Sequence, residues 1–147
     1  MPYQKNTKGY VFSNDKRLLQ TRRIHAFLSQ ESYWSKNIPL DTVKASIRGS
    51  ECFAVYHQGK QIGFARVITD YATFGYLADV YIEQEYRGLG LSHRLMDFIL
   101  AYPGFKKLRR FMLATLDAHS LYRQHGFELL AEPGRFMERK SFETYRA

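Results

Sequence analysis

Apolar and polar residues alternate along this chain in short segments that predict a mixed α/β protein. Apolar positions recur at helical spacing in residues 14–30, 40–47 and 90–102. Pro39 and Gly49 bracket the second of these segments, and Pro103-Gly104 ends the third. Short runs typical of strands occupy residues 10–13, 52–57, 61–69, 74–83 and 111–115. A short helix bearing Tyr122 follows, and we expect Phe127–Leu130 and Arg135–Lys140 to close the sheet as two more strands.

The predicted strand at residues 74–83 carries acids in an otherwise apolar run. Side chains point to opposite faces of a strand in turn. This alternation predicts Asp79, Tyr81 and Glu83 on one face, and Val80 and Ile82 on the other.

Length and composition predict one domain over residues 1–147, since this length and 45% apolar residues can supply a core. The polar start of the chain does not resemble a signal peptide, and no apolar run approaches the roughly 20 residues that span a bilayer. We therefore expect a cytoplasmic protein with no membrane partner. Cys52 is the only cysteine and lies in a strand between Glu51 and Phe53, which favours a packed residue over a nucleophile.

A net charge of +8 would suit an anionic partner such as a nucleic acid. The basic residues are scattered, however, and no nucleic-acid-binding motif occurs, so we expect no nucleic-acid partner. The densest basic group is Lys106–Arg110, between a helix and a strand. It is either a solvated loop or a source of cations for a phosphate-bearing ligand.

Arg87-Gly-Leu-Gly-Leu-Ser92 connects the strand at 74–83 to the helix at 90–102 and has the character of a phosphate cradle. Its glycines allow the backbone to approach a ligand closely, and the first N–H groups of the helix point at an anion in the turn. The chain lacks the G-x-x-x-x-G-K-[ST] string of a P-loop. A dinucleotide fingerprint would need glycine at position 93, which is His93.

A second sequence motif makes the assignment of the cradle more specific. Asp117-Ala-His-Ser-Leu-Tyr-Arg-Gln-His-Gly-Phe127 follows a predicted strand about thirty residues later. Together the R-x-x-G-x-S turn and this A-x-x-L-Y-x-x-x-G-F pattern resemble the GNAT superfamily of acyl-CoA-dependent N-acetyltransferases. Ser92 departs from the usual glycine or alanine, and Thr115 replaces a common asparagine, which puts one local hydrogen bond in doubt.

The resemblance implies a GNAT fold: a mixed, mostly antiparallel sheet that splays between its fourth and fifth strands, flanked by about four helices. It implies acetyl-CoA as co-substrate. The spacing of the histidines and Cys52, which fits no metal-ligand pattern, predicts no metal. Backbone groups of Val80, Tyr81 and Ile82 would bind the pantetheine arm and the thioester. The pyrophosphate would lie on the backbone of the cradle, which comprises Arg87, Gly88, Leu89, Gly90, Leu91 and Ser92.

Tyr122 matches the tyrosine that many members place near the CoA sulfur. A tyrosine with an ordinary pKa of about 10 would give its proton uphill to a thiolate near 8.5, so a hydrogen bond to the sulfur is at least as plausible as proton transfer. A tyrosine that only packs the short helix on the sheet is the structural alternative.

The proton acceptor for the amine is not fixed by the sequence. Asp79 would be useful if burial raised its pKa, but it could equally be a structural acid with a basic partner. His119 lies one helical turn before Tyr122 and is the other possibility, although a surface histidine is the more ordinary interpretation. The remaining histidines show no metal-ligand spacing.

The acceptor side in the family is lined by loops that here contain Tyr33, Trp34, Tyr71 and Phe74. Aromatic walls suit an amine with an apolar body or a cation over ring faces, but these residues could also fill the core. We expect an N-acetyltransferase acting on a small-molecule or peptide amine, as a monomer or homodimer. The alternative is a non-catalytic acyl-CoA-binding sensor with the same fold.

Overall fold

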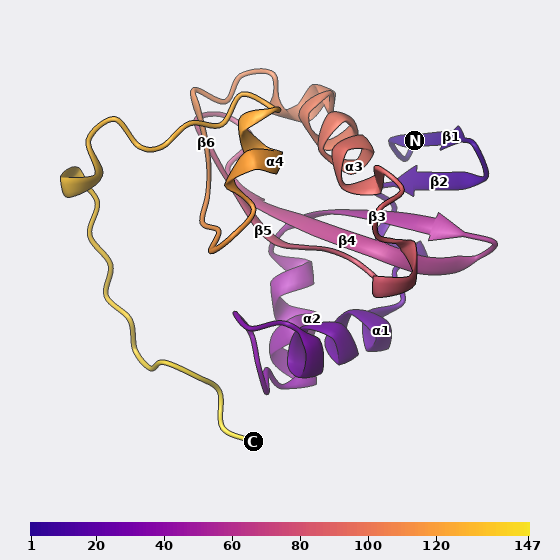
Figure 1. Ribbon diagram of the computed structural model, residues 1–147, viewed down its shortest axis with the longest axis horizontal. Helices are drawn as coiled ribbons and strands as arrows, with labels where there is room; N and C mark the ends of the chain where they lie inside the picture. The colour runs from indigo at the N-terminus through magenta and orange to yellow at the C-terminus, as the bar shows by residue number, and fades with distance from the viewer.

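The structure is a computed structural model that describes residues 1–147. Its centre is one sheet of six strands in the order β1-β2-β3-β4-β5-β6 (Figure 1). The strands are β1 (Gln4–Thr7), β2 (Tyr10–Ser13), β3 (Glu51–His57), β4 (Lys60–Thr69), β5 (Phe74–Ile82) and β6 (Arg110–Leu113). Neighbours are antiparallel except for β5 and β6, which are parallel. The expected mixed, mostly antiparallel GNAT-type sheet is therefore confirmed.

Helices cover both faces of the sheet (Figure 1). One layer contains α1 (Thr21–Ala26) and α2 (Leu40–Arg48), and the other contains α3 (Leu91–Leu100) and α4 (His119–Arg123). Each layer has its own apolar core. Ile24, Phe27, Val43 and Tyr81 belong to the α1/α2 core, whereas Leu77, Ile82, Leu95 and Tyr122 belong to the α3/α4 core.

Several predicted boundaries are confirmed. Helix α2 begins after Pro39 and ends at Gly49, and α3 begins after Gly90. The first predicted helix differs, because Asp15 caps a separate 3-10 turn at Lys16–Leu18 and α1 begins only at Thr21. Helix α1 then continues as a π-helical turn, Phe27–Glu31. Short 3-10 turns also occur at Gln84–Tyr86, Pro103–Phe105 and Pro133–Arg135.

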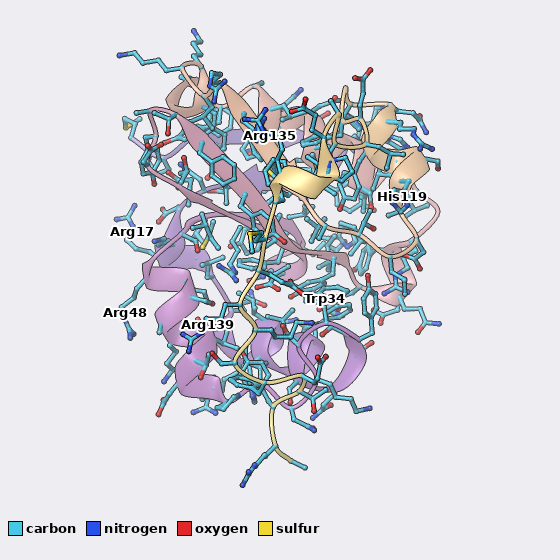
Figure 2. All side chains as sticks on the ribbon, turned by 90° about the vertical axis from the view of Figure 1, so that its left-hand side faces the viewer. Arg17, Trp34, Arg48, His119, Arg135 and Arg139 are labelled. Atoms are coloured by element: carbon cyan, nitrogen blue, oxygen red, sulfur yellow. The ribbon has the colours of Figure 1, made fainter.

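The two ends of the sheet were predicted wrongly. Strand β1 was not expected, yet it pairs along its whole length with β2. The strands expected at Phe127–Leu130 and Arg135–Lys140 do not form. The turn at Pro133–Arg135 interrupts this stretch, and the rest is an extended arm without ladder partners that leads past Arg135 and Arg139 (Figure 2). Its side chains remain largely exposed, Met137 at 95%.

A bulge in β5 determines which face of the sheet the side chains of the site residues point to. Phe64 pairs with Tyr81 and Arg66 with Ala78, so Asp79 and Val80 together face the single residue Ala65. Asp79 adopts a left-handed backbone with φ of 55°. Because one extra residue is absorbed there, Leu77 and Asp79 do not share a face as strict alternation would require. Asp79 and Tyr81 still lie on the α1/α2 side and Val80 and Ile82 on the other, as predicted.

Cys52 is a packed core residue, as predicted, and lies in the α1/α2 core at 1% exposure. Burial raises the pKa of the Cys52 thiol to about 12, so the thiolate is disfavoured at neutral pH. None of the helices has both the length and the apolar character that crossing a membrane requires.

Candidate functional site

The predicted cradle forms a pocket where β5 passes into α3. Gly88 and Gly90 have φ of 80° and 78°, and a Cβ at either position would meet open space. The turn is therefore shaped by backbone conformation rather than by tight packing. Side chains of Ile82, Tyr86, Arg87, Leu91, Ser92, His93 and Leu121 complete its lining. The side chain of Leu89 is exposed instead.

The first turn of α3 offers donors to this pocket. Gly90 provides no side-chain cap, and the first intrahelical bond runs from Arg94 N–H to the Gly90 carbonyl. The N–H groups of Leu91, Ser92 and His93 therefore have no acceptor in the protein. Unpaired N–H groups and the positive end of the helix dipole fit a phosphate or diphosphate.

Strand β5 parts from β6 next to the cradle. Their pairing ends at Leu77–Leu113, so residues 78–82 have no neighbour on that edge. Glu83 N–H donates to the Ile62 carbonyl on the β4 side at 2.8 Å. The Ile82 carbonyl points the other way and accepts from Arg87 Nε at 2.9 Å. By the alternation of an antiparallel ladder, Val80 and Ile82 direct backbone groups into the gap, while Tyr81 directs its own to β4.

A cavity of about 480 Å³ opens in this gap. It is bounded by Leu77–Val80 on β5 and by residues 113–118 on the other side. Tyr33, Trp34, Arg66, Tyr76 and Tyr122 supply most of its large side chains. Leu116 N–H donates to the Tyr33 hydroxyl at 3.1 Å, which ties the loop after α1 to the loop after β6 beside the cavity. The structure thus brings together five predicted site residues from three distant segments, namely Tyr33, Trp34, Asp79, Val80 and Tyr122.

Asp79 is held on both carboxylate oxygens. Arg66 Nε donates to Oδ2 at 2.6 Å, and Trp34 Nε1 donates to Oδ1 at 2.8 Å. Arg66 also donates through Nη1 to the Ser50 hydroxyl at 3.0 Å. Asp79 is 9% exposed, so the ion pair and the indole satisfy a nearly buried charge.

Tyr122 lies between two cavities. Its side chain lines the β5/β6 cavity and also a smaller one of about 260 Å³ beyond β6. Burial raises the pKa of Tyr122 to about 12. The adjacent residue, Leu121, lines the cradle. The short helix α4 therefore joins the cradle to the cavity.

Other predicted site residues lie elsewhere. His119 is exposed and lines only the smaller cavity beyond β6. Figure 2 shows it on the α4 side, apart from Trp34, which lies beside the α1/α2 layer. Tyr71 lies in the turn before β5 and donates to Glu51 at 3.2 Å, and Phe74 is the first residue of β5. Neither contributes to the cavity that Tyr33 and Trp34 line.

The basic segment Lys106–Arg110 is far from the cradle. Arg110 pairs with Phe74 at the start of β5, whereas the cradle follows the end of that strand. Phosphates in the cradle would therefore not reach these cations, and the solvated-loop interpretation of the segment is favoured.

Sequence reasoning missed Arg66, the partner of Asp79. A signal was present, since Arg66 is the only charge inside the apolar run Ile62–Thr69, just as Asp79 is the only one inside the next strand. Two lone opposite charges in adjacent strands favour a pair. The Thr115 hydroxyl accepts from Ala118 N–H at 3.0 Å and supports the start of α4.

The comparisons with known proteins agree with this geometry. Residues 48–129, more than half of the chain, match the model of the acetyltransferase (GNAT) domain family. A candidate acetyltransferase from Gibberella zeae is 35% identical over an alignment of 137 residues, and the match covers 79% of this chain and 77% of that protein. A crystal structure from Xanthomonas campestris pv. campestris, assigned to the GNAT family as a candidate acetyltransferase, is 47% identical with a TM-score of 0.88, covering 92% of this chain and 95% of that one.

A more distant structure extends the likeness of fold. Glucosamine-6-phosphate N-acetyltransferase from Arabidopsis thaliana superposes with a TM-score of 0.62 at 15% identity, over 90% of this chain and 98% of that one. At this identity the likeness concerns the fold alone. The family-model match and the two relatives that are 35% and 47% identical establish the family as well as the fold. The chain belongs to the GNAT family of acetyltransferases.

Proposed function

We propose that this protein transfers an acetyl group from acetyl-CoA to a primary amine by direct attack. One observation carries the proposal: consecutive residues of α4 line the two halves of the site. Leu121 lines the cradle and Tyr122 lines the cavity, so one elongated ligand can place phosphates at the first and a thioester at the second.

The cradle and the open edge of β5 would hold the two ends of acetyl-CoA. The free N–H groups of Leu91, Ser92 and His93 suit the diphosphate. The Ile82 N–H and the Val80 carbonyl suit an extended arm with amide groups, which would pair with β5 as an added strand does. Arg87 fixes the Ile82 carbonyl and so orients the peptide that leads into the cradle.

Acetyl-CoA supplies an activated acetyl group as a thioester. In the reaction the amine nitrogen forms a bond to the acetyl carbon, the carbon–sulfur bond breaks, the amine loses a proton and the sulfur leaves as thiolate. A phenol with a pKa of about 12 would protonate a thiolate of ordinary pKa near 8.5 only at a cost of several kcal/mol. We therefore assign to Tyr122 a hydrogen bond that stabilises charge on the sulfur.

Asp79 and His119 remain the candidates for receiving the amine proton. Asp79 lines the same cavity as Tyr122, whereas His119 does not. Both Asp79 oxygens already accept hydrogen bonds, from Arg66 and from Trp34, so the atoms that would receive the amine proton are already engaged. We propose that Asp79 mainly positions Trp34. The pH–rate profiles of Asp79→Asn and His119→Gln test which of these two residues receives the amine proton.

The acceptor cavity favours an amine with an apolar or aromatic body. Tyr33 and Trp34 meet edge to face with ring centroids 5.0 Å apart, and Tyr76 lines the same cavity. Such walls suit ring stacking or a cation over a ring face. Tyr71 and Phe74 lie outside this cavity, so the proposal rests on Tyr33 and Trp34.

The test is release of CoA thiol from acetyl-CoA with a panel of polyamines, aminoglycosides, amino acids, aryl amines and peptides. Activity confined to amines with apolar or aromatic bodies would support the proposal. Binding of acetyl-CoA without transfer to any acceptor would favour a non-catalytic acyl-CoA sensor. Failure to bind acetyl-CoA in calorimetry would overturn the assignment of the cradle.

A further inference from the structure

Arg66 has one donor group that the protein leaves open. Its side chain lines the cavity between β5 and β6 and is 17% exposed. Nε donates to Asp79 at 2.6 Å, and Nη1 donates to the Ser50 hydroxyl at 3.0 Å, whereas Nη2 makes no hydrogen bond within the protein. The buried side-chain polar atoms that lack a partner belong to other residues, so Nη2 is reachable from solvent.

The open donor is held in a fixed orientation. Two hydrogen bonds anchor the Arg66 guanidinium, one to β5 and one to Ser50, the residue before β3. A planar guanidinium is a good partner for a carboxylate or a phosphate. Because the side chain is already ordered, an anion that reaches Nη2 from the cavity does not bear the entropy cost of ordering it.

The charges that line the cavity restrict the kind of anion. Arg66 is the only cation among the lining residues, and Asp79 and Asp117 are the only acids. Asp117 is exposed on the loop after β6. A phosphate monoester, which carries up to two negative charges, would meet this surplus of acids. A ligand with one ammonium and one carboxylate group matches the lining better, with the ammonium toward the acids and the carboxylate on Nη2.

The two charges of such a ligand must be close together. Arg66 and Asp79 are in direct contact, since Nε and Oδ2 are 2.6 Å apart. An amine and a carboxylate on the same carbon have a similarly short separation. The aromatic side chains of Tyr33, Trp34 and Tyr76 line the same cavity and offer a surface to whatever else that carbon carries.

We propose that the acceptor is a free α-amino acid with an aromatic or apolar side chain, and that Arg66 binds its carboxylate through Nη2. This inference rests on the proposed acetyl transfer. The ammonium form of the amino acid and acetyl-CoA would give the N-acetylamino acid, the CoA thiol and one proton.

Other amines fit the cavity less well. In a peptide, the group beside the N-terminal amine is a neutral amide, which cannot form an ion pair with Arg66. Polyamines and aminoglycosides carry additional cations and no carboxylate, so they would place positive charge near the guanidinium. We therefore expect free amino acids to be better acceptors than any of these.

L-phenylalanine and L-phenylalaninamide are the probes, because they differ only in the charged group. The measurement is kcat/KM from CoA thiol release, for the wild type and for Arg66→Lys. Lysine keeps a positive charge beside Asp79 but lacks the second arm of the guanidinium. The acid-to-amide ratio should fall about tenfold in Arg66→Lys, as loss of a hydrogen bond to a charged group would give. The two amines differ in basicity, but this factor is the same for each protein and cancels when the ratios are compared.

Two further measurements make the test independent of one variant. Arg22→Lys makes the same change at an exposed position on α1, outside the cavity, and should leave the ratio unchanged. In the wild type alone, L-phenylalanine should be a better acceptor than 2-phenylethylamine, which has the same ring and a more basic amine but no carboxylate. That comparison is made per concentration of neutral amine, and it holds even where Arg66→Lys fails to fold.

The outcomes separate this inference from the function beneath it. An acid-to-amide ratio that is unchanged in Arg66→Lys, or a wild type that prefers 2-phenylethylamine, would overturn the role of Arg66 while acetyl transfer stands. Acetylation confined to polyamines, aminoglycosides or peptides would likewise overturn the amino-acid class alone. Absence of transfer to every amine would overturn the proposed function and this inference with it.

Discussion

The indole N–H of Trp34 donates to Oδ1 of Asp79 over 2.8 Å, although 45 residues separate the two in sequence. The bond joins the loop after α1 to the bulge in β5, where Asp79 has a left-handed backbone. An aromatic residue of the proposed acceptor wall is thus fixed by a charge at the proposed reaction site.

Trp34→Phe removes the indole donor but keeps a ring at this position. We expect KM for the acceptor to rise about tenfold, the loss typical of a hydrogen bond to a charged group, with little change in acetyl-CoA affinity. Steady-state kinetics with each substrate varied in turn provide the measurement. Tyr33→Phe, which loses the bond to Leu116 but leaves Asp79 paired, is the control and should have a smaller effect. Equal effects of the two variants would argue against the importance of the Asp79 contact.

Tyr122→Phe removes a hydroxyl from the junction of the two cavities. Turnover should fall about 10- to 100-fold, because charge on the departing sulfur loses its donor, while acetyl-CoA affinity changes little. Single-turnover rates and calorimetry separate the two quantities. Tyr10→Phe, on β2 and outside both cavities, is the matched control. An unchanged turnover number would eliminate the assigned role.

Gly90→Ala and Gly59→Ala form a matched pair. The φ values are 78° and 79°, and neither Cβ would meet an atom within 4 Å. Both should lower the free energy of unfolding by about 1–2 kcal/mol through backbone strain. Only Gly90→Ala should also weaken CoA binding, because Gly59 lies in the β3–β4 turn. Denaturant unfolding and calorimetry test this, and equal loss of affinity in both variants would contradict the cradle assignment.

We expect the hydrogen bonds of Asp70 to stabilise the folded protein in a pH-dependent way. Its carboxylate accepts from the N–H groups of Ala72, Thr73 and Phe74 and from the Thr73 hydroxyl. These bonds hold the pKa of Asp70 well below its usual range. A lowered folded-state pKa gives stability that is complete above the unfolded pKa of about 3.9 and is lost as pH falls toward the folded value.

Asp70→Asn should therefore lower the melting temperature at pH 7 by a few degrees. The difference from wild type should narrow below about pH 4, where the unfolded reference begins to take up its proton. Thermal unfolding at pH 7 and pH 3 is the measurement. A difference that is as large at pH 3 as at pH 7 would show that the carboxylate charge is not responsible.

The sequence predicted those parts of the fold that have local signals. Pro39 and Gly49 mark the ends of α2, and the glycine turn marks the start of α3. Strand β1 carries no such signal, because its four residues, Gln4–Thr7, are polar and three are exposed. It exists because β2 offers an edge to pair with. The strand expected at Arg135–Lys140 has suitable residues but no ladder partner.

The site was predictable where it depends on backbone and less so where it depends on long-range contacts. The cradle follows from glycine positions and a helix start. The partners of Asp79 depend on the register of β4 against β5 and on a loop 45 residues away. Strict alternation of side chains along a strand does not predict the bulge in β5.

Because β5 parts from β6, the exchange rate of one backbone amide at this edge can report whether a ligand is bound. The Ile82 amide is in a buried strand, yet it faces the gap rather than β4. Its proton should exchange with deuterium faster than those of the flanking residues, Tyr81 and Glu83, which face β4. Any ligand that pairs with this edge would slow that one exchange, so a single amide signal reports occupancy of the site even when no acceptor is known.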